Sequence, residues 1–206
     1  MLKIWGRINS INVQKVALCA EDLGLDYERS DVGGAFGGND TPEYLAMNPN
    51  GRVPTIDDDG LVLWESNAIV RYLALKHGRG GLCPDDPARH ADADRWMDWQ
   101  ATMLTPAMHP VFWGLVRTEP EARDEAAIAQ SAKAATACVA LLDAHLAGRS
   151  FVTGETFTMG DIPVGAAVHR WLHLPMDRPA AANVEAWYQR VMQRPGASKI
   201  LTAPIT

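Results

Sequence analysis

The chain has 206 residues, 47% of them hydrophobic and 21% charged, and a formal net charge of −6, as is typical of a globular protein with one large domain or two small ones. This acidic balance and the lack of a cluster of lysines and arginines argue against a nucleic-acid-binding protein. Three scattered cysteines, no visible secretory leader and no apolar run near the ~20 residues of a membrane span predict a cytoplasmic protein.

Short strands and helices alternate in the first part of the chain. Residues 2–5 (LKIW) predict an apolar strand, and residues 13–23 repeat apolar side chains at helical spacing before Gly24 ends the helix. Residues 25–32 predict a second strand, and this strand–helix–strand order favours parallel pairing. The glycine-rich segment 33–40 lacks the spacing of a phosphate-binding loop, so we expect a flexible loop there.

Residues 50–56 (NGRVPTI) combine β-forming side chains with a proline. Pro54 has no N–H for a sheet, so it belongs at an edge, at the first position of a strand or at a bend. Two interpretations fit this position. Pro54 is either an ordinary proline at a strand start, or it follows a cis bond that turns the main chain of Val53 away from its own sheet. Residues 61–64 then predict the second strand of a hairpin, followed by a helix.

The segment rich in glycine and proline near residue 80 is the best linker candidate, and the pattern beyond it is helical almost throughout. We expect prolines in residues 106–110 to bend or break one helix. These features predict an α/β domain at residues 1–77, a linker at 78–87 and an all-helical domain at 88–206.

A helix start is predicted within residues 157–162 (FTMGDI). Thr158 can cap the N–H at the third helical position, while Asp161 reaches back to the N–H of Thr158. Phe157 and Ile162 can pack together across this start as a hydrophobic staple. We assign Asp161 a structural role rather than a catalytic one.

Four motifs together resemble the soluble glutathione transferase family, in its serine-type, theta- and phi-like bacterial branch. They are RINSINVQKV (7–16), NPNGRVP (48–54), LWESNAIVRYLA (63–74) and TMGDI (158–162), in the order and at the spacing of that family. The resemblance implies an α/β plus all-α fold, with an N-terminal thioredoxin-like domain followed by a C-terminal helical bundle domain. It also implies an enzyme that conjugates the thiolate of glutathione to small electrophiles.

The resemblance assigns most glutathione contacts to two of these motifs. The main chain of Val53, before Pro54, would pair with the cysteinyl residue of glutathione as one strand pairs with another. Glu65 would pair with the γ-glutamyl ammonium, and Ser66, at a helix N-terminus, with the carboxylate. Taken alone, Ser66 is an ordinary N-cap and Glu65 a favourable acid in a first helical turn. Two further residues fall where family members contact the glycyl end or the backbone: Arg52 and Asn39.

Ser10 is the first candidate for activating the glutathione thiol, because it lies between the first strand and the first helix. Asn12 is the second candidate, since its amide could donate to the same sulfur. Each could instead be a simple N-cap of that helix. Cys19 falls well inside the helix, which disfavours the thiol-exchange branch of the family, whose members use a cysteine at this turn.

The electrophile pocket is expected between the domains, from residues of the early second domain: Met103, His109, Trp113 and Arg117. We expect no metal site, because His169 and His173 form a pair at helical spacing without a third ligand. No cofactor is expected beyond glutathione as co-substrate.

Family resemblance also implies a homodimer, with Arg71 and the helix carrying Trp96 and Trp99 as contributors to the interface. Two other functions stay open. One is glutathione-dependent reduction of disulfides or peroxides, which Asn12 permits. The other is a non-catalytic binding protein, which the presence of Ser10, Glu65 and Ser66 disfavours.

Overall fold

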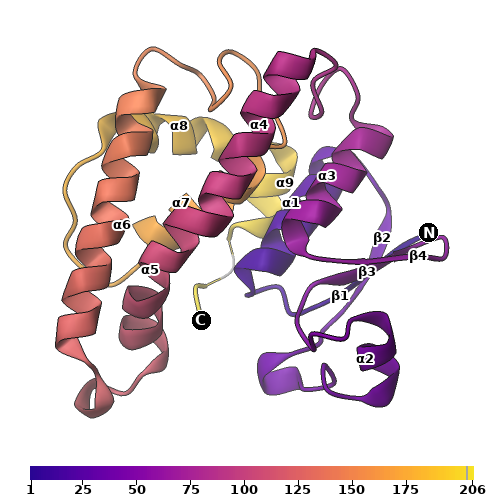
Figure 1. The fold of residues 1–206 in the computed structure, drawn as a ribbon, viewed down its shortest axis with the longest axis horizontal. Coiled ribbons are helices and arrows are strands. Elements are labelled where there is room, and N and C mark those ends of the chain that lie inside the picture. Colours follow the sequence, from indigo (N-terminus) through magenta and orange to yellow (C-terminus); the bar gives the residue numbers. More distant parts are fainter. Residues whose placement is uncertain (203) are drawn as a thin grey trace.

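The computed structural model describes residues 1–202 and 204–206, and Figure 1 shows its two halves side by side. The first half contains β1 (Leu2–Trp5), α1 (Ile11–Asp22), β2 (Tyr27–Ser30), α2 (Pro42–Met47), β3 (Thr55–Asp58), β4 (Leu61–Trp64) and α3 (Ser66–His77). The second half contains α4 (Pro87–Trp99), α5 (Thr105–Phe112), α6 (Glu125–Leu146), α7 (Asp161–Leu172), α8 (Ala182–Met192) and α9 (Pro195–Ile200). This order confirms the predicted α/β plus all-α fold.

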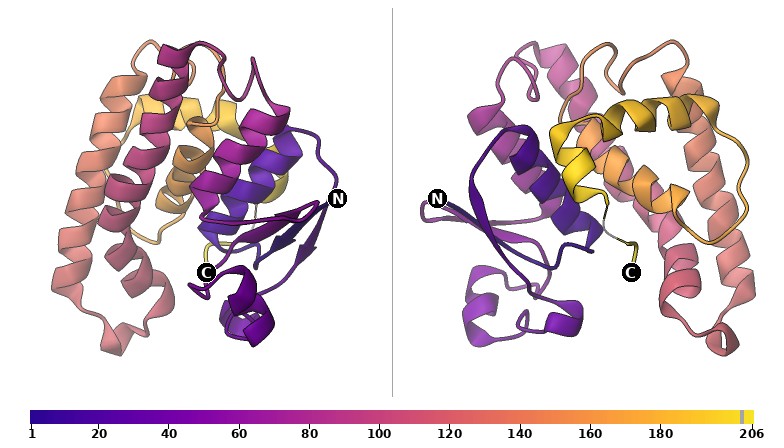
Figure 2. Two further views of the ribbon diagram at one scale, coloured as in Figure 1. Left: turned by 45° about the vertical axis from the view of Figure 1, so that its right-hand side comes forward. Right: turned by 180° about the vertical axis from the view of Figure 1, so that it is seen from behind.

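The sheet of the first half has the strand order β2-β1-β3-β4. β1 pairs with β2 in parallel, as predicted, while β3 pairs antiparallel with both β1 and β4. Ile4 and Ile56 lie opposite each other in this register and are fully buried. α1 and α3 cover one face of the sheet, and α2 lies beyond the other (Figure 2).

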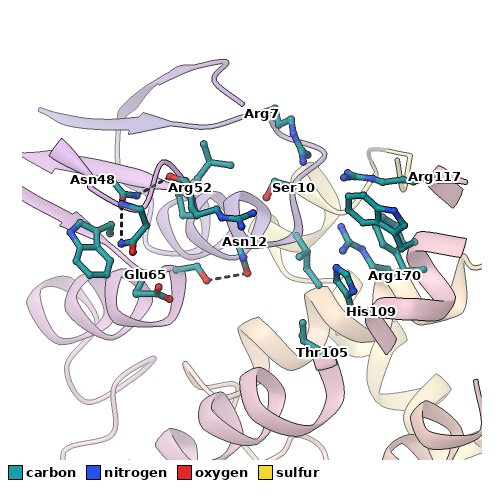
Figure 3. Close-up of a pocket in the computed structure, with 18 residues that line it drawn as sticks. Arg7, Ser10, Asn12, Asn48, Arg52, Glu65, Thr105, His109, Arg117 and Arg170 are labelled. Carbon is teal, nitrogen blue, oxygen red and sulfur yellow. Dashed lines mark hydrogen bonds between the residues drawn. The ribbon is translucent and has the colours of Figure 1, made fainter. Parts of the chain in front are cut away.

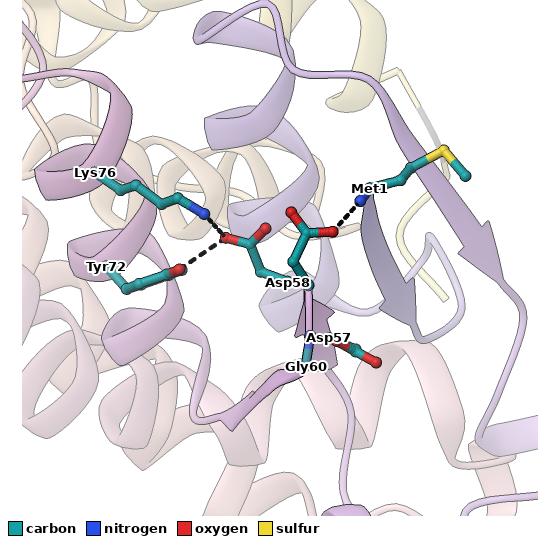
Figure 4. Close-up of polar contacts among 7 residues, drawn as sticks. Met1, Asp57, Asp58, Gly60, Tyr72 and Lys76 are labelled. Carbon is teal, nitrogen blue, oxygen red and sulfur yellow. Dashed lines mark hydrogen bonds and ion pairs between the residues drawn. The ribbon is translucent and has the colours of Figure 1, made fainter.

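Acidic residues of the β3–β4 turn hold the hairpin in place (Figure 4). The buried carboxylate of Asp58 accepts hydrogen bonds from Lys76 at 2.6 Å and from Tyr72 at 2.8 Å, both on α3. Asp59 pairs with the amino group of Met1. Charge-assisted bonds of this kind fix the hairpin against both α3 and β1.

The core of the second half is built around α7, which is buried from Asp161 to His169. A helix that is apolar on all sides is stable only when other elements surround it. α1, α4 and α8 pack against α7, so this helix joins the cores of the two halves. No helix in the described part of the chain is both long and apolar enough to cross a bilayer.

The last helix returns to the first half. A Cβ atom at Gly196 of α9 would lie 2.3 Å from the main-chain oxygen of Leu18, so only glycine permits this approach to α1. The carboxylate of Asp22 accepts hydrogen bonds from Arg194 at 2.9 Å and from the N–H of Gly196 at 3.1 Å. α9 therefore fixes the position of α1, which carries Ser10 at its start.

Of the two outcomes predicted for residues 106–110, a bend or a break of the helix, the break does not occur. α5 continues through Pro110, and π-helical segments precede and follow it at Gln100–Leu104 and Trp113–Arg117. A proline removes one main-chain N–H, and its ring crowds the carbonyl group one turn earlier. The wider turns on either side accommodate this loss without ending the helix.

At the start of α7, one of the two predicted capping hydrogen bonds is present and the other is not. Asp161 accepts a hydrogen bond from the N–H of Thr158 at 2.9 Å, as expected. The Thr158 hydroxyl donates to the same carboxylate at 3.3 Å instead of capping a helical N–H. Val152 N–H and Trp187 Nε1 also donate to Asp161, each at 2.9 Å. Burial raises the pKa of Asp161 to about 6, although the hydrogen bonds to its carboxylate act in the opposite direction and lower the pKa.

Candidate active site

A cavity of about 400 Å³ is lined by residues of both halves of the molecule (Figure 3). The first half contributes the loop after β1, the start of α1, the segment before β3 and the start of α3. The second half contributes α5, the π-helical segment after it and the end of α7. Most of the residues that the sequence singles out as functional lie in this lining.

Ser10 occupies the N-cap position of α1 and lines the cavity. Its main-chain oxygen accepts the first helical hydrogen bond, from Gln14 N–H at 2.9 Å. Its hydroxyl makes no capping hydrogen bond and has no partner among the described residues. Ser10 is 9% exposed, so this hydroxyl is a nearly buried donor that faces the cavity. The alternative interpretation, in which the Ser10 side chain caps α1, therefore does not hold.

Asn12 lies on the first turn of α1 and also lines the cavity. Its Oδ1 atom accepts a hydrogen bond from the Ser66 hydroxyl at 3.2 Å. This bond orients the amide, so that its NH₂ group is left to donate to another partner. The two candidate activators therefore lie close together, and one of them contacts a predicted glutathione-binding residue.

The bond between Val53 and Pro54 is cis, which decides between the two interpretations of this proline. Val53 lies outside the β3 ladder, and neither its N–H nor its C=O makes a hydrogen bond within residues 1–202 and 204–206. The preceding carbonyl, that of Arg52, accepts hydrogen bonds from Tyr44 at 2.6 Å and from Asn48 at 2.8 Å. This buried polar support was not predicted, although Asn48 belongs to the NPNGRVP motif.

Glu65 and Ser66 lie at the start of α3, beside the cavity. Glu65 has φ 71°, a value uncommon for any residue but glycine, so neighbouring structure must stabilise a conformation that costs ~1–3 kcal/mol. Its side chain is exposed and makes no capping bond. The Glu65 carboxylate can bind an ammonium group, and the neighbouring N-terminus of α3 can bind a carboxylate. The two groups of one ligand can therefore bind side by side.

Two predicted site residues do not line the cavity. The side chain of Asn39 donates instead to the main-chain oxygen of Gly51 at 2.8 Å and supports the turn before Arg52. Met103 is 54% exposed and lies two residues before Thr105, which does line the cavity. Met103 belongs to the π-helical segment Gln100–Leu104, where the rotation per residue differs from that of an α-helix.

His109, Trp113 and Arg117 all line the cavity, because their spacing of four residues places them on one helix face. The rings of His109 and Trp113 stack with centroids 5.6 Å apart. The guanidinium of Arg117 lies 5.1 Å from the Trp113 ring centroid, on the same wall.

Sequence reasoning missed two arginines in this lining, Arg7 and Arg170. Arg170 follows directly on the buried stretch of α7, and a charged residue after such a run was the signal available. Its guanidinium lies 3.9 Å from the centroid of Phe112. Burial, Arg117 and Arg7 lower the pKa of Arg170 to about 10.

Lys15, one turn along α1 from the cavity lining, was also missed. It is 3% exposed, and its ammonium has no hydrogen bond or ion pair with any residue that the structure describes. Burial and the charge of Arg170 lower its pKa to about 7, while Glu65 acts in the opposite direction.

The remaining predicted polar residues are engaged elsewhere. His173 Nδ1 hydrogen-bonds to the main-chain oxygen of His169 at 2.7 Å, and His169 Nδ1 pairs with Tyr188 Oη at 2.6 Å. Within the described ranges, no group of three or more His, Cys, Asp or Glu could hold a metal ion. Arg71, expected at a dimer interface, forms ion pairs with Asp94 and Asp98 of its own chain.

Comparisons with known proteins agree with this geometry. Residues 1–75 match the family described as "Glutathione S-transferase, N-terminal domain", and residues 125–190 match "Glutathione S-transferase, C-terminal domain". The chain is 50% identical over 171 residues to glutathione S-transferase GstB of Escherichia coli K12, covering 82% of each protein. It is 35% identical to glutathione S-transferase 3 of Zea mays, covering 78% of this chain and 73% of that one. A crystal structure of a theta class glutathione S-transferase from Xanthomonas axonopodis pv. citri with glutathione bound is 46% identical, with a TM-score of 0.96 over 100% of this chain and 99% of that one.

Proposed function

We propose that this chain, which belongs to the glutathione S-transferase family and is a glutathione transferase, activates the glutathione thiol through the Ser10 hydroxyl. The reaction would take place in the cavity between the two halves of the molecule. The unpartnered hydroxyl of Ser10 at the N-terminus of α1 carries this assignment. A donor without a protein partner, nine-tenths buried, gains most from a ligand acceptor.

We assign glutathione to the first half of the cavity. Its cysteinyl residue would pair with the free N–H and C=O of Val53, as a strand pairs with a sheet edge. The γ-glutamyl ammonium would meet Glu65, and its carboxylate would meet Ser66 at the N-terminus of α3. Arg52 would hold the glycyl carboxylate. A solved relative with glutathione bound, 46% identical to this chain, supports the assignment of this ligand.

The interactions available at Ser10 are strong enough to lower the pKa of the glutathione thiol by about two units. A free thiol has a pKa of about 8.5, and lowering that value to about 6.5 requires about 2.7 kcal/mol of preference for the thiolate. A hydrogen bond to a charged acceptor contributes about 1.5–3 kcal/mol, and a helix N-terminus adds about 0.3–1 kcal/mol. The thiolate would then attack the electrophile, held beside it by the second half of the cavity.

Reductase or peroxidase chemistry through a protein cysteine has less support. No cysteine is among the described residues that line the cavity. Cys19 is fully buried in α1, and burial followed by the charge of Asp22 raises the pKa of its thiol far above the ordinary value. A buried thiol that stays protonated is a poor nucleophile.

The test is a pH titration of thiolate ultraviolet absorbance with glutathione bound, in the wild type, Ser10→Ala and Asn12→Ala. We expect an apparent thiol pKa well below 8.5 in the wild type. Ser10→Ala should raise that pKa and lower the conjugation rate about 10- to 100-fold. A near-wild-type Ser10→Ala with a slow Asn12→Ala would transfer the role to Asn12. Tight binding without a lowered thiol pKa would refute activation by either residue.

We also propose that the protein acts in the cytoplasm as a homodimer, in detoxification of electrophiles. Support for dimerisation comes from large apolar side chains outside the cavity that are 46–54% exposed, among them Leu75 and Met103. Light scattering after size-exclusion chromatography would give twice the monomer mass of 22.5 kDa, and a monomer at micromolar concentration would contradict the proposal.

A further inference from the structure

The electrophile half of the cavity carries an excess of positive charge. Arg7, Arg117 and Arg170 come from three separate elements and line the same cavity, in addition to Arg52 on the glutathione side (Figure 3). Glu65 is the one acidic residue among the described residues of this lining. The imbalance is local, because the chain as a whole has a net charge of −6.

None of these three arginines pairs with an Asp or Glu side chain among the described residues. Arg7 donates to the Asn9 amide oxygen at 3.0 Å, and Arg117 donates to an oxygen of Thr206, the last residue of the sequence, at 2.6 Å. Arg170 rests on the Phe112 ring, and its buried Nε has no hydrogen-bond partner. Some arginines outside the cavity pair with carboxylates, among them Arg29 with Asp31 and Arg194 with Asp22, whereas others, such as Arg123, donate to main-chain carbonyl groups.

The charges are close enough to repel one another. The guanidinium carbons of Arg117 and Arg170 lie 5.3 and 3.9 Å from the centroid of the same ring, that of Phe112. Burial, and then the charge of Arg117, lowers the pKa of Arg7. A cluster of guanidinium groups without acidic side chains is unfavourable, most of all for the buried Arg170, and an anion placed among its members would offset this repulsion.

Glutathione by itself does not account for this charge. In the proposed binding mode, Arg52 holds the glycyl carboxylate, and Ser10 with the α1 N-terminus stabilises the thiolate. Arg7, Arg117 and Arg170 therefore remain for the second substrate. Trp113, 49% exposed and stacked on His109, offers a flat apolar surface next to them.

We propose that the second substrate is an aromatic electrophile that carries a carboxylate, bound through Arg117 and Arg7 with its ring against Trp113 and His109. The inference rests on the proposed function, since glutathione supplies the nucleophile. The thiolate sulfur forms a bond to the ring carbon that carries the leaving group. The leaving group departs as an anion with the electron pair of its bond, and the carboxylate is unchanged.

Two matched probes test the proposal: 4-chloro-3,5-dinitrobenzoate and its neutral carboxamide, each with glutathione and each corrected for its uncatalysed rate. The wild type should prefer the carboxylate. Arg117→Met and Arg7→Met should each raise its KM about 10- to 100-fold and change the KM for the carboxamide much less. Arg117→Lys should raise the KM for the carboxylate probe less than Arg117→Met does, because lysine keeps the positive charge but not the bidentate geometry of arginine. Arg149→Met, on an exposed arginine after α6, is the control and should change neither value.

Four results would overturn the proposal. Equal corrected kcat/KM for the two probes, or arginine variants that keep the wild-type ratio, would refute it while leaving the transferase function intact. If the arginine variants had a lower kcat/KM with both probes and a raised pKa of the bound thiol, the arginines would act on the thiolate instead of on the second substrate. Turnover of neither probe, without glutathione binding, would refute the proposed function itself.

Discussion

Replacing Asp161 should cost more stability than replacing any exposed helix cap of this protein. Its carboxylate is fully buried and accepts four hydrogen bonds, from Val152 N–H, Trp187 Nε1 and the N–H and hydroxyl of Thr158. Asp161→Ala leaves three N–H donors without partners, and each such buried donor costs about 1–3 kcal/mol. The expected loss is therefore about 3–9 kcal/mol, a large part of the stability of a typical domain.

Asp124→Ala is the matched control, because Asp124 caps α6 through one hydrogen bond to Ala127 N–H at 2.9 Å and is exposed. Removing it should cost about 1 kcal/mol. Asp161→Asn keeps one acceptor oxygen and should lose about 2–4 kcal/mol, so it stays measurable if the alanine variant does not fold.

Urea unfolding followed by far-ultraviolet circular dichroism gives these free energies, and isothermal titration gives the glutathione affinity of the folded fraction, which should not change. If Asp161→Ala cost no more than Asp124→Ala, burial and the four hydrogen bonds would not explain the role of Asp161. A selective loss of glutathione affinity would refute a purely structural role.

Two further predictions concern glutathione binding and the buried lysine. Ser66→Ala removes the hydroxyl assigned to the γ-glutamyl carboxylate and the hydrogen bond to Asn12. It should raise the Kd for glutathione about tenfold and slow the chemical step less, and an unchanged Kd would contradict the assignment. Lys15→Met removes a buried ammonium whose pKa is lowered to about 7 by burial and Arg170. Since the unfolded chain keeps the proton up to a pH of about 10.4, the free energy of unfolding of the wild type relative to this variant should rise by at most about 1.4 kcal/mol per pH unit above pH 7. Urea titrations at pH 6, 7.5 and 9 measure the difference, and a value independent of pH would contradict the lowered pKa.

The sequence determined the parts of this protein that depend on neighbouring residues. The order of strands and helices follows from apolar spacing, and the parallel pairing of β1 and β2 follows from the helix between them. Pro54 can occupy few positions near a sheet, which limited the interpretations to two. The contact of Asp161 with the Thr158 N–H spans only three residues and was predictable for the same reason.

Only the tertiary structure decided which side chains meet in the cavity. The bond between Ser66 and Asn12 joins residues 54 positions apart, and Arg7 and Arg170 come together because α7 packs against α1. Met103, predicted in the electrophile pocket, does not line the cavity, since residue type does not give the rotation of a helix that contains two prolines and two π-helical segments. Local pattern limits which elements form, whereas packing between distant elements sets the charge of the cavity, and that charge carries the inference about the second substrate.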